Sequence, residues 1–355
     1  MSTLPDRRNN FDFLRLLFAS LVIFSHSFAL TQTDEIFSRI SNQQIGGGSL
    51  AVNCFFTISG YLIFRSLQRC KSPFDYLWKR ALRVFPGLFV MLLLSLGIIA
   101  IVYTGKNVFA EPTFRSYLPG NLSLYRVQYE VKEVFENNPY PRAINGSLWT
   151  LHLEFSLYVL LLLLFPIRNK NNWAKIMLAL MIIFAIWATK KNVYLFHSLL
   201  INLRIDTALL YPLSVYFLIG SFFSLFDLQR INFWYVKSIL LVIILVALLF
   251  NVYSWIVYCT VPLLALLVGI SHHSLLSIVP SKIGDISYGV YIYGFIVQQT
   301  FMNYFKMGPY TLAILSLIVT YMLGILSWSF VEKKALLFKD LLSNKLAKHR
   351  IDKSD

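Results

Sequence analysis

The chain has 355 residues, of which 57% are hydrophobic, 16% aromatic and only 14% charged. Its mean hydropathy is +0.62, and together these values exclude an ordinary soluble globular protein. A formal net charge of +15 would suggest nucleic-acid binding in a soluble protein. In a membrane protein, Lys and Arg instead collect in the cytoplasmic loops. The composition therefore indicates a polytopic helical membrane protein that contacts lipid and binds no nucleic acid.

Ten apolar segments could each cross a bilayer, which takes about 20 residues of helix. We expect these spans near residues 11–31, 48–67, 81–104, 147–167, 173–189, 208–226, 234–251, 254–271, 285–305 and 310–331. The region 190–210 could be a re-entrant or interfacial piece. The predicted fold is an all-α bundle of about ten transmembrane helices, with a transmembrane domain over residues 1–335 and a basic cytoplasmic tail over 336–355.

The distribution of basic residues predicts the orientation. Of the 32 Lys and Arg residues, 21 fall on the side of the termini, ten on the other side, and Arg15 within the first span. Both termini are therefore expected in the cytoplasm. The long outer loop, 105–146, carries Tyr117, Tyr125, Tyr129 and Tyr140. Tyrosine rings suit sugar binding, but they are also common at membrane interfaces.

The first span, residues 11–30, contains Arg15 and His26. Eleven helical positions advance by about three turns and rise by about 16 Å, so both side chains lie on one face. A central Arg costs at least ~2.5 kcal/mol in a membrane helix, and such groups face protein or water. The alternatives are that Arg15 reaches to the interface and that His26 is a packing residue.

Two further segments place polar groups at span ends. Lys79, Arg80 and Arg83 lie at the cytoplasmic start of the third span. Arginine side chains bind phosphates through two parallel hydrogen bonds, although orientation alone also puts arginines there. In the segment 145–158, Glu154 lies about 10 Å into a span that begins on the outer side, at a depth similar to His26. It is either a functional carboxylate or a helix-packing group, and it must be paired or protonated. The three cysteines have no metal-site spacing, and we expect no metal.

Several motifs together resemble a known family. They are FDFLR with ten residues between Arg15 and His26, FFTISGYL, Arg80-x-x-Arg83 before Pro86, NGSLWTLHLE, ISYGVYIY and FVEK. Their order over about residues 11 to 335 is similar to that of the acyltransferase-3 membrane O-acyltransferases, in the stand-alone form without an appended hydrolase domain.

The resemblance implies a bacterial inner-membrane enzyme that transfers an acyl group, usually acetyl from acetyl-CoA, to a sugar of an O-antigen, lipopolysaccharide or exopolysaccharide. It implies essential roles for His26 and Arg15 and a cofactor role for Arg80 and Arg83. Many members have His where Gly294 stands, so no role is carried over to that position. Lys334 stands where many family members have Pro after the acidic residue, so no role is assigned to Glu332. The simplest interpretation is that Glu332 forms an interfacial ion pair with the neighbouring lysines.

We therefore expect an O-acyltransferase that uses cytoplasmic acyl-CoA and a glycan or lipid-linked sugar acceptor. His26 is expected to act as general base or acyl carrier, with Glu154 and Arg15 as further catalytic residues. Cofactor binding is assigned to Lys79, Arg80 and Arg83, and substrate binding to Ser147, Trp149, Tyr288 and Tyr291. The alternative is a transporter or flippase for a glycan or lipid-linked sugar, for which intramembrane Arg, His and Glu are also expected.

Overall fold

The computed structural model describes residues 9–192, 196–202, 204–271 and 283–341, and these residues form helices and connecting turns without a β-strand. Among them, seven helices are long and apolar enough to cross a membrane. The all-α membrane fold is thus confirmed, and the number ten is not. Of the remaining predicted spans, two are helices shorter than 18 residues, Thr207–Phe223 and Trp234–Leu249. The third, Ser287–Tyr304, is rich in Tyr, Gly and Gln.

The helices follow the predicted segments closely. They are α1 (Phe11–Leu30), α3 (Gly47–Arg69), α4 (Pro73–Val102), α6 (Leu151–Leu160), α7 (Asn171–Lys191), α9 (Thr207–Phe223), α10 (Trp234–Leu249), α11 (Tyr253–Ile270), α13 (Ser287–Tyr304) and α14 (Pro309–Ser327). Helix α4 begins earlier than expected because Ser72 accepts a hydrogen bond from the Asp75 backbone and Pro73 occupies the first turn. The region 190–210 contains the short α8 (His197–Asn202), and residues 193–195 and 203 lie outside the described part.

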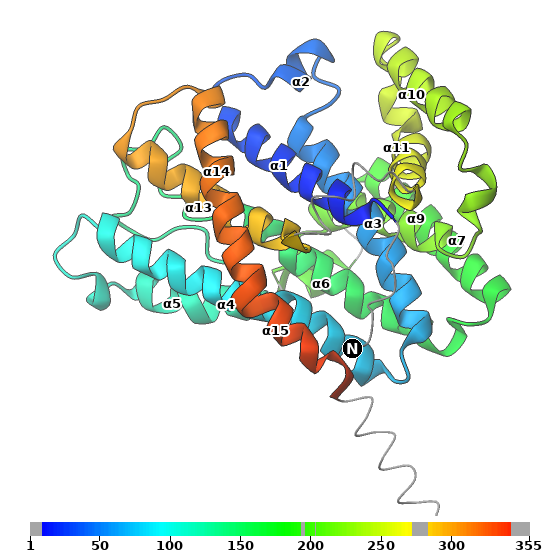
Figure 1. Cartoon of the computed structure of the whole chain (residues 1–355), viewed down its shortest axis with the longest axis horizontal. Helices are drawn as coiled ribbons and strands as arrows, with labels where there is room; N and C mark the ends of the chain where they lie inside the picture. The colour runs from blue at the N-terminus through cyan, green and yellow to red at the C-terminus, as the bar shows by residue number, and fades with distance from the viewer. Residues whose placement is uncertain (1–8, 193–195, 203, 272–282, 342–355) are drawn as a thin grey trace, which may run out of the picture.

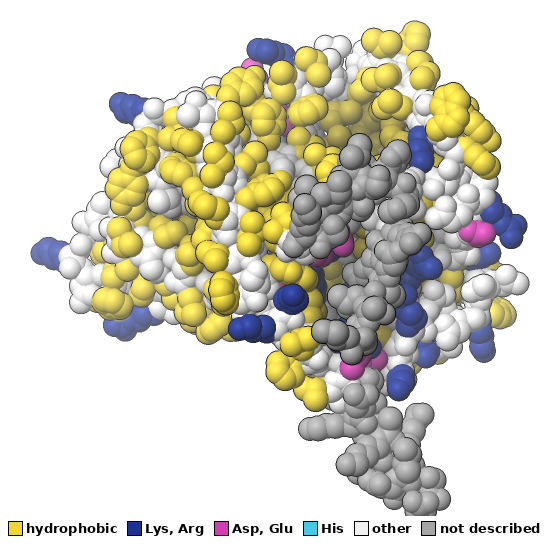
Figure 2. Space-filling model, viewed as in Figure 1, with side chains coloured by type: hydrophobic (Ala, Val, Ile, Leu, Met, Phe, Trp, Pro, Cys, Tyr) yellow, Lys and Arg dark blue, Asp and Glu magenta, His cyan; other side chains and the backbone are white. Residues whose placement is uncertain are grey.

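Helix α1 lies in the middle of the bundle and packs against α3, α13 and α14 (Figure 1). Helices α7, α9, α10 and α11 gather beside α3, away from α13 and α14. The sequence places an Arg and a His on α1, and this central position brings them into protein. Exposed hydrophobic side chains lie along α14 and at the end of α13, as expected for contact with lipid (Figure 2).

Helices α3 and α9 approach closely at two glycines. A Cβ on Gly60 would lie 1.9 Å from the Phe217 carbonyl oxygen, and one on Gly220 would lie 2.0 Å from that of Thr57. Backbone atoms cannot move aside as a flexible side chain can, so only glycine fits at both positions. Small residues of this kind are typical of tightly packed membrane helices. The contact fixes the position of α3, which lines one side of a cavity within the bundle.

The loop 105–146, which the sequence predicts on the outer side, packs in large part against the bundle. It contains the turn η1 (Val108–Ala110) and α5 (Pro112–Leu122), which packs on α4. Gln299 of α13 donates to the carbonyl oxygens of Tyr140 and Ala143 at 2.9 and 2.7 Å. Of the four tyrosines, Tyr117 is fully buried, whereas Tyr129 and Tyr140 are exposed. Only part of the expected aromatic surface is therefore accessible.

The helix that begins with α14 continues to Asp340 through a π-helical turn, η5 (Trp328–Glu332), then α15 (Lys333–Ala335) and η6 (Leu336–Asp340). A π-turn adds a residue to one turn and changes the direction of the side chains that follow. Glu332 is thereby buried, while Lys333 and Lys334 are exposed. The helix passes residue 335 without a break, and residues 342–355 of the expected tail lie outside the described part.

Candidate functional site

A cavity of about 810 Å³ lies between α1, α3, α4, α6 and α13. Its polar and charged lining includes Arg15, Ser59, Arg65, Arg69, Lys79, Arg80, Arg83, Thr150, Glu154, Tyr158, Asp285, Tyr288, Tyr291 and Lys339. Seven basic and four acidic side chains line it in all. We call the end formed by the last turns of α3 and the first turns of α4 the basic mouth, and the end formed by Ser59, Thr150 and Glu154 the deep end.

The basic mouth carries Arg65, Arg69, Lys79 and Arg80. Arg80 donates to Ser66 Oγ at 3.3 Å, and its buried Nε atom has no hydrogen-bond partner among the described residues. Lys79 is held by the buried Asp75 carboxylate at 3.0 Å. Arg80 is therefore a guanidinium with unused hydrogen-bonding capacity beside the cavity.

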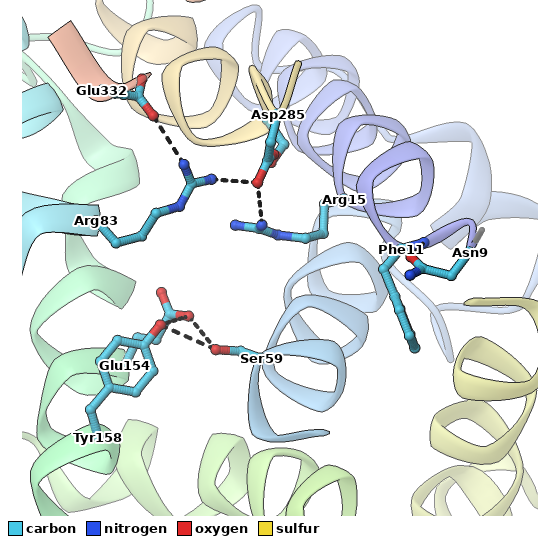
Figure 3. Close-up of polar contacts among 10 residues, drawn as sticks. Asn9, Phe11, Arg15, Ser59, Arg83, Glu154, Tyr158, Asp285 and Glu332 are labelled. Carbon is cyan, nitrogen blue, oxygen red and sulfur yellow. Dashed lines mark hydrogen bonds and ion pairs between the residues drawn. The ribbon is translucent and has the colours of Figure 1, made fainter. Parts of the chain in front are cut away.

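A four-residue ionic network lies beside the cavity, and its members Arg15, Arg83 and Asp285 line it (Figure 3). Asp285 Oδ2 accepts hydrogen bonds from Arg15 Nη1 at 2.6 Å and from Arg83 Nη2 at 2.7 Å. Arg83 Nη1 also donates to Glu332 Oε2 at 3.3 Å. We call Arg15, Asp285, Arg83 and Glu332 the arginine–carboxylate network. It joins α1, the segment before α13, α4 and the π-turn η5.

The residues around this network hold the two carboxylates in place. Ser287 donates to Asp285 Oδ1 at 2.5 Å, and Ser327 donates to Glu332 Oε1 at 2.9 Å. Gly284 has φ +85, and a Cβ there would lie 2.0 Å from the Trp328 indole nitrogen. The left-handed backbone and the close ring both require glycine, which lets the chain turn Asp285 toward the arginines.

Glu154 lies at the deep end of the cavity, apart from the arginines (Figure 3). Its Oε1 accepts hydrogen bonds from Ser59 and from Tyr158, each at 2.6 Å. Both donors come from positions that the helix geometry sets, since Tyr158 is one turn after Glu154 on α6 and Ser59 faces it from α3. Two hydrogen bonds to one oxygen fix the orientation of the carboxylate.

His26 lies nearer the C-terminal end of α1 and is not among the residues that line the cavity. Its ring meets Phe295 edge-on at 5.2 Å, and its buried Nδ1 has no hydrogen-bond partner among the described residues. A Cβ on Gly294 would lie 2.6 Å from Ile23, so the glycine allows α1 and α13 to approach here. Within the described residues, no hydrogen bond links His26 to Glu154.

The four predicted substrate residues divide into two pairs. Tyr288 and Tyr291 line the cavity: Tyr288 donates to the Val84 carbonyl oxygen at 2.8 Å, and the Tyr291 and Thr150 hydroxyls are 2.6 Å apart. Ser147 and Trp149 do not line it; Ser147 is buried with an unpartnered hydroxyl and Trp149 is half-buried. The motif 145–158 thus contributes Thr150, Glu154 and Tyr158 to the cavity.

Sequence reasoning missed Asp285 and misread Glu332. Asp285 lies 270 positions from Arg15 and 202 from Arg83, so local spacing gives no signal for either contact. An Asp directly before an aromatic span was the one available hint. The interpretation of Glu332 as an interfacial partner of the neighbouring lysines is wrong, because the π-turn buries it against Arg83.

No group of three or more His, Cys, Asp or Glu side chains that could hold a metal ion occurs in the described part of the chain. The cavity instead offers guanidinium groups at its mouth and a carboxylate with hydroxyls at its deep end. Such a layout can bind an elongated molecule that is anionic at one end and uncharged at the other.

Comparison with known proteins agrees with the motif pattern. The model of the acyltransferase-3 family, described as an acyltransferase domain, matches residues 8–331. A protein named O-acetyl transferase from Shigella phage Sf6 is 29% identical over 341 residues, covering 93% of this chain and 96% of the relative. Nodulation protein 10 from Rhizobium leguminosarum bv. viciae is 25% identical over 347 residues, covering 93% of each. No solved structure matches the chain.

The two arginines of the Arg80-x-x-Arg83 motif should differ in their effect on stability. Arg83→Ala leaves the buried Glu332 without its arginine, and removing one partner of a buried ion pair costs about 3–5 kcal/mol. Arg80→Ala removes one long hydrogen bond and should cost less than about 1 kcal/mol. We expect thermal unfolding of the purified proteins in detergent to show a lower midpoint for Arg83→Ala alone. Equal midpoints would contradict the structural role of Arg83.

Proposed function

The chain belongs to the acyltransferase-3 family, and from this premise we propose that it transfers an acetyl group from acetyl-CoA to a sugar hydroxyl. The acceptor is a cell-surface polysaccharide, an O-antigen or a lipid-linked glycan, and the enzyme works in the bacterial inner membrane. The observation that carries the proposal is the cavity with a basic mouth and a deep end where hydroxyl groups surround the single carboxylate of Glu154. The name of the phage relative, O-acetyl transferase, supports the acetyl group and an oxygen acceptor.

The donor binds through the basic mouth, which faces the cytoplasm in the predicted orientation. Arg80 is the principal phosphate ligand, because its Nε has no partner and a guanidinium binds phosphate in a bidentate manner. Lys79 adds positive charge nearby, although Asp75 restrains it. Arg83 contributes to the electrostatic field of the cofactor site but keeps its hydrogen bonds to Asp285 and Glu332.

The thioester end of the donor reaches past the arginine–carboxylate network. Arg15 and His26 are separated along α1 by about 16 Å of helix rise, and the pantetheine arm is long and thin enough to cover this span. Tyr288 and Tyr291 line its path. The nucleotide stays at the mouth while the acetyl group is presented in the outer half of the bundle.

The transfer needs a base and an orienting group. His26 takes the proton of the acceptor hydroxyl as its oxygen attacks the thioester carbonyl carbon. The carbon–sulfur bond breaks, an ester forms, and the CoA thiolate leaves and takes up the proton. An acetyl-His26 intermediate that then passes the group to the sugar is the alternative route. The free Nδ1 of His26 suits both.

Glu154 is the second proposed catalytic carboxylate. In the resting protein its Oε1 is held by Ser59 and Tyr158, so a charge-balancing role toward His26 acts through the electrostatic field and not through a direct hydrogen bond. Ser147 and Trp149, at the outer start of the same motif, are proposed to contact the acceptor together with the exposed Tyr129 and Tyr140. Family membership favours this enzyme over a flippase of lipid-linked sugars.

His26→Ala should abolish acetylation while the protein still accumulates in the membrane. The assay supplies purified protein with labelled acetyl-CoA and bacterial surface polysaccharide from which ester groups have been removed by mild alkali; mass spectrometry reads the product. His152→Ala is the matched control, because it also removes an imidazole with a buried, unpartnered Nδ1 outside the cavity lining, at a position with no proposed catalytic role. Near-normal acetylation by His26→Ala would refute the catalytic assignment.

Arg80→Ala should weaken CoA binding by about 10- to 100-fold, since a charge-assisted hydrogen bond contributes on the order of 1.5–3 kcal/mol. Isothermal titration of the purified protein with CoA measures this, and the wild-type affinity should fall as salt is added. Arg230→Ala, at an exposed pair with Asp227 outside the cavity, serves as the control. Wild-type affinity in Arg80→Ala would mean that this arginine only sets the orientation of the chain.

A further inference from the structure

We infer that Asp285 determines where the donor binds along the cavity, by neutralising Arg15 and Arg83 so that the anionic end is retained at the basic mouth. The inference rests on the proposed use of acyl-CoA. It makes Asp285 a positioning and specificity-determining residue that acts through two arginines.

Both carboxylate oxygens of Asp285 accept hydrogen bonds. One oxygen, Oδ2, accepts from both guanidinium groups at 2.6 and 2.7 Å, and the other accepts from Ser287. The side chains of Arg15, Arg83 and Asp285 are only 23%, 16% and 14% exposed, so water screens these interactions weakly. Short charge-assisted hydrogen bonds in such surroundings are strong. In the resting protein, Asp285 therefore occupies the arginine groups that would otherwise bind phosphate.

Arg15 and Arg83 differ in how far they depend on Asp285 as an ion-pair partner. Asp285 is the only ion-pair partner found for Arg15 among the described residues, whereas Arg83 also contacts Glu332. Loss of the Asp285 charge would leave Arg15 free to bind an anion and Arg83 partly free. Both lie beside the cavity, deeper than Arg80, because Arg83 is one turn further along α4 and Arg15 is in the second turn of α1.

The charge of the lining side chains changes along the cavity. Arg65, Arg69, Lys79 and Arg80 make the mouth positive, the network in the middle is close to neutral, and Glu154 makes the deep end negative. A molecule with phosphates at one end and an uncharged thioester at the other is most stable with its phosphates at the mouth. Without Asp285, the middle of the cavity would compete with the mouth for the same phosphates and draw the nucleotide too deep.

Two roles of Asp285, neutralisation of the arginines and a structural link between α1 and α4, lead to different effects on donor binding and turnover. If Asp285 only held α1 and α4 together, its loss would weaken donor binding and turnover together. If Asp285 neutralises the arginines, Asp285→Asn should bind CoA more tightly. It should also turn over more slowly, because the nucleotide of the donor then binds too deep in the cavity.

The experiment compares wild type, Asp285→Asn, Asp285→Glu and the control Asp227→Asn, which removes the same charge from an exposed pair outside the cavity. CoA affinity is measured by titration calorimetry and kcat by consumption of labelled acetyl-CoA with the de-esterified polysaccharide. We expect Asp285→Asn to bind CoA about three- to tenfold more tightly, with a steeper salt dependence, and to lose at least about tenfold in kcat. Asp285→Glu keeps the charge and should keep an affinity near wild type.

Unchanged or weaker CoA binding by a folded Asp285→Asn protein would overturn the inference and leave the proposed function intact. Absence of CoA binding by the wild type would overturn both. If Asp285→Asn does not accumulate, Ser287→Ala replaces it, because it releases Oδ1 and loosens the carboxylate while keeping its charge. A smaller gain in CoA affinity is then expected, and no gain would overturn the inference.

Discussion

The sharing of one Asp285 oxygen by Arg15 and Arg83 is the constraint on which the rest of the structure depends. Two guanidinium groups inside a helical bundle repel each other and are costly to desolvate unless a carboxylate lies between them. Asp285 meets this requirement for α1 and α4, and Glu332 extends it to the long C-terminal helix. The π-turn at Trp328–Glu332 and the left-handed Gly284 are local distortions that bring these carboxylates to the arginines.

The same network divides the cavity into two functional regions. On one side, the mouth presents the arginine and lysine side chains of α3 and α4; on the other, Ser59, Tyr158 and Glu154 form an independent hydrogen-bonded group. The proposed use of acyl-CoA would need such a division, because the nucleotide of the donor must be held while its uncharged thioester reaches the acceptor. The close α3–α9 contact at Gly60 and Gly220 keeps α3 rigid enough to contribute to both regions.

The helical segments were predictable from the sequence because the length of each apolar run indicates whether it can span a membrane. The position of Arg15 inside such a run favoured a side chain that faces protein or water, with a position at the interface as the alternative. The partner of Arg15 was not predictable, since it lies 270 residues away and only the folded chain brings the two together. Arg80 and Arg83 were indistinguishable by spacing, yet their surroundings differ: Arg83 meets two carboxylates and Arg80 meets a serine hydroxyl. Glu332 was misread because a π-turn alters helical periodicity without a recognisable sequence signal.

The central claim is that donor and acceptor approach from opposite ends of the bundle. Sealed membrane vesicles of known orientation test it most directly, with labelled acetyl-CoA on the predicted cytoplasmic face and impermeant, de-esterified polysaccharide on the other face. The account predicts labelled polysaccharide when the two substrates are separated by the membrane. Label that appears only when both substrates share the cytoplasmic face would contradict it.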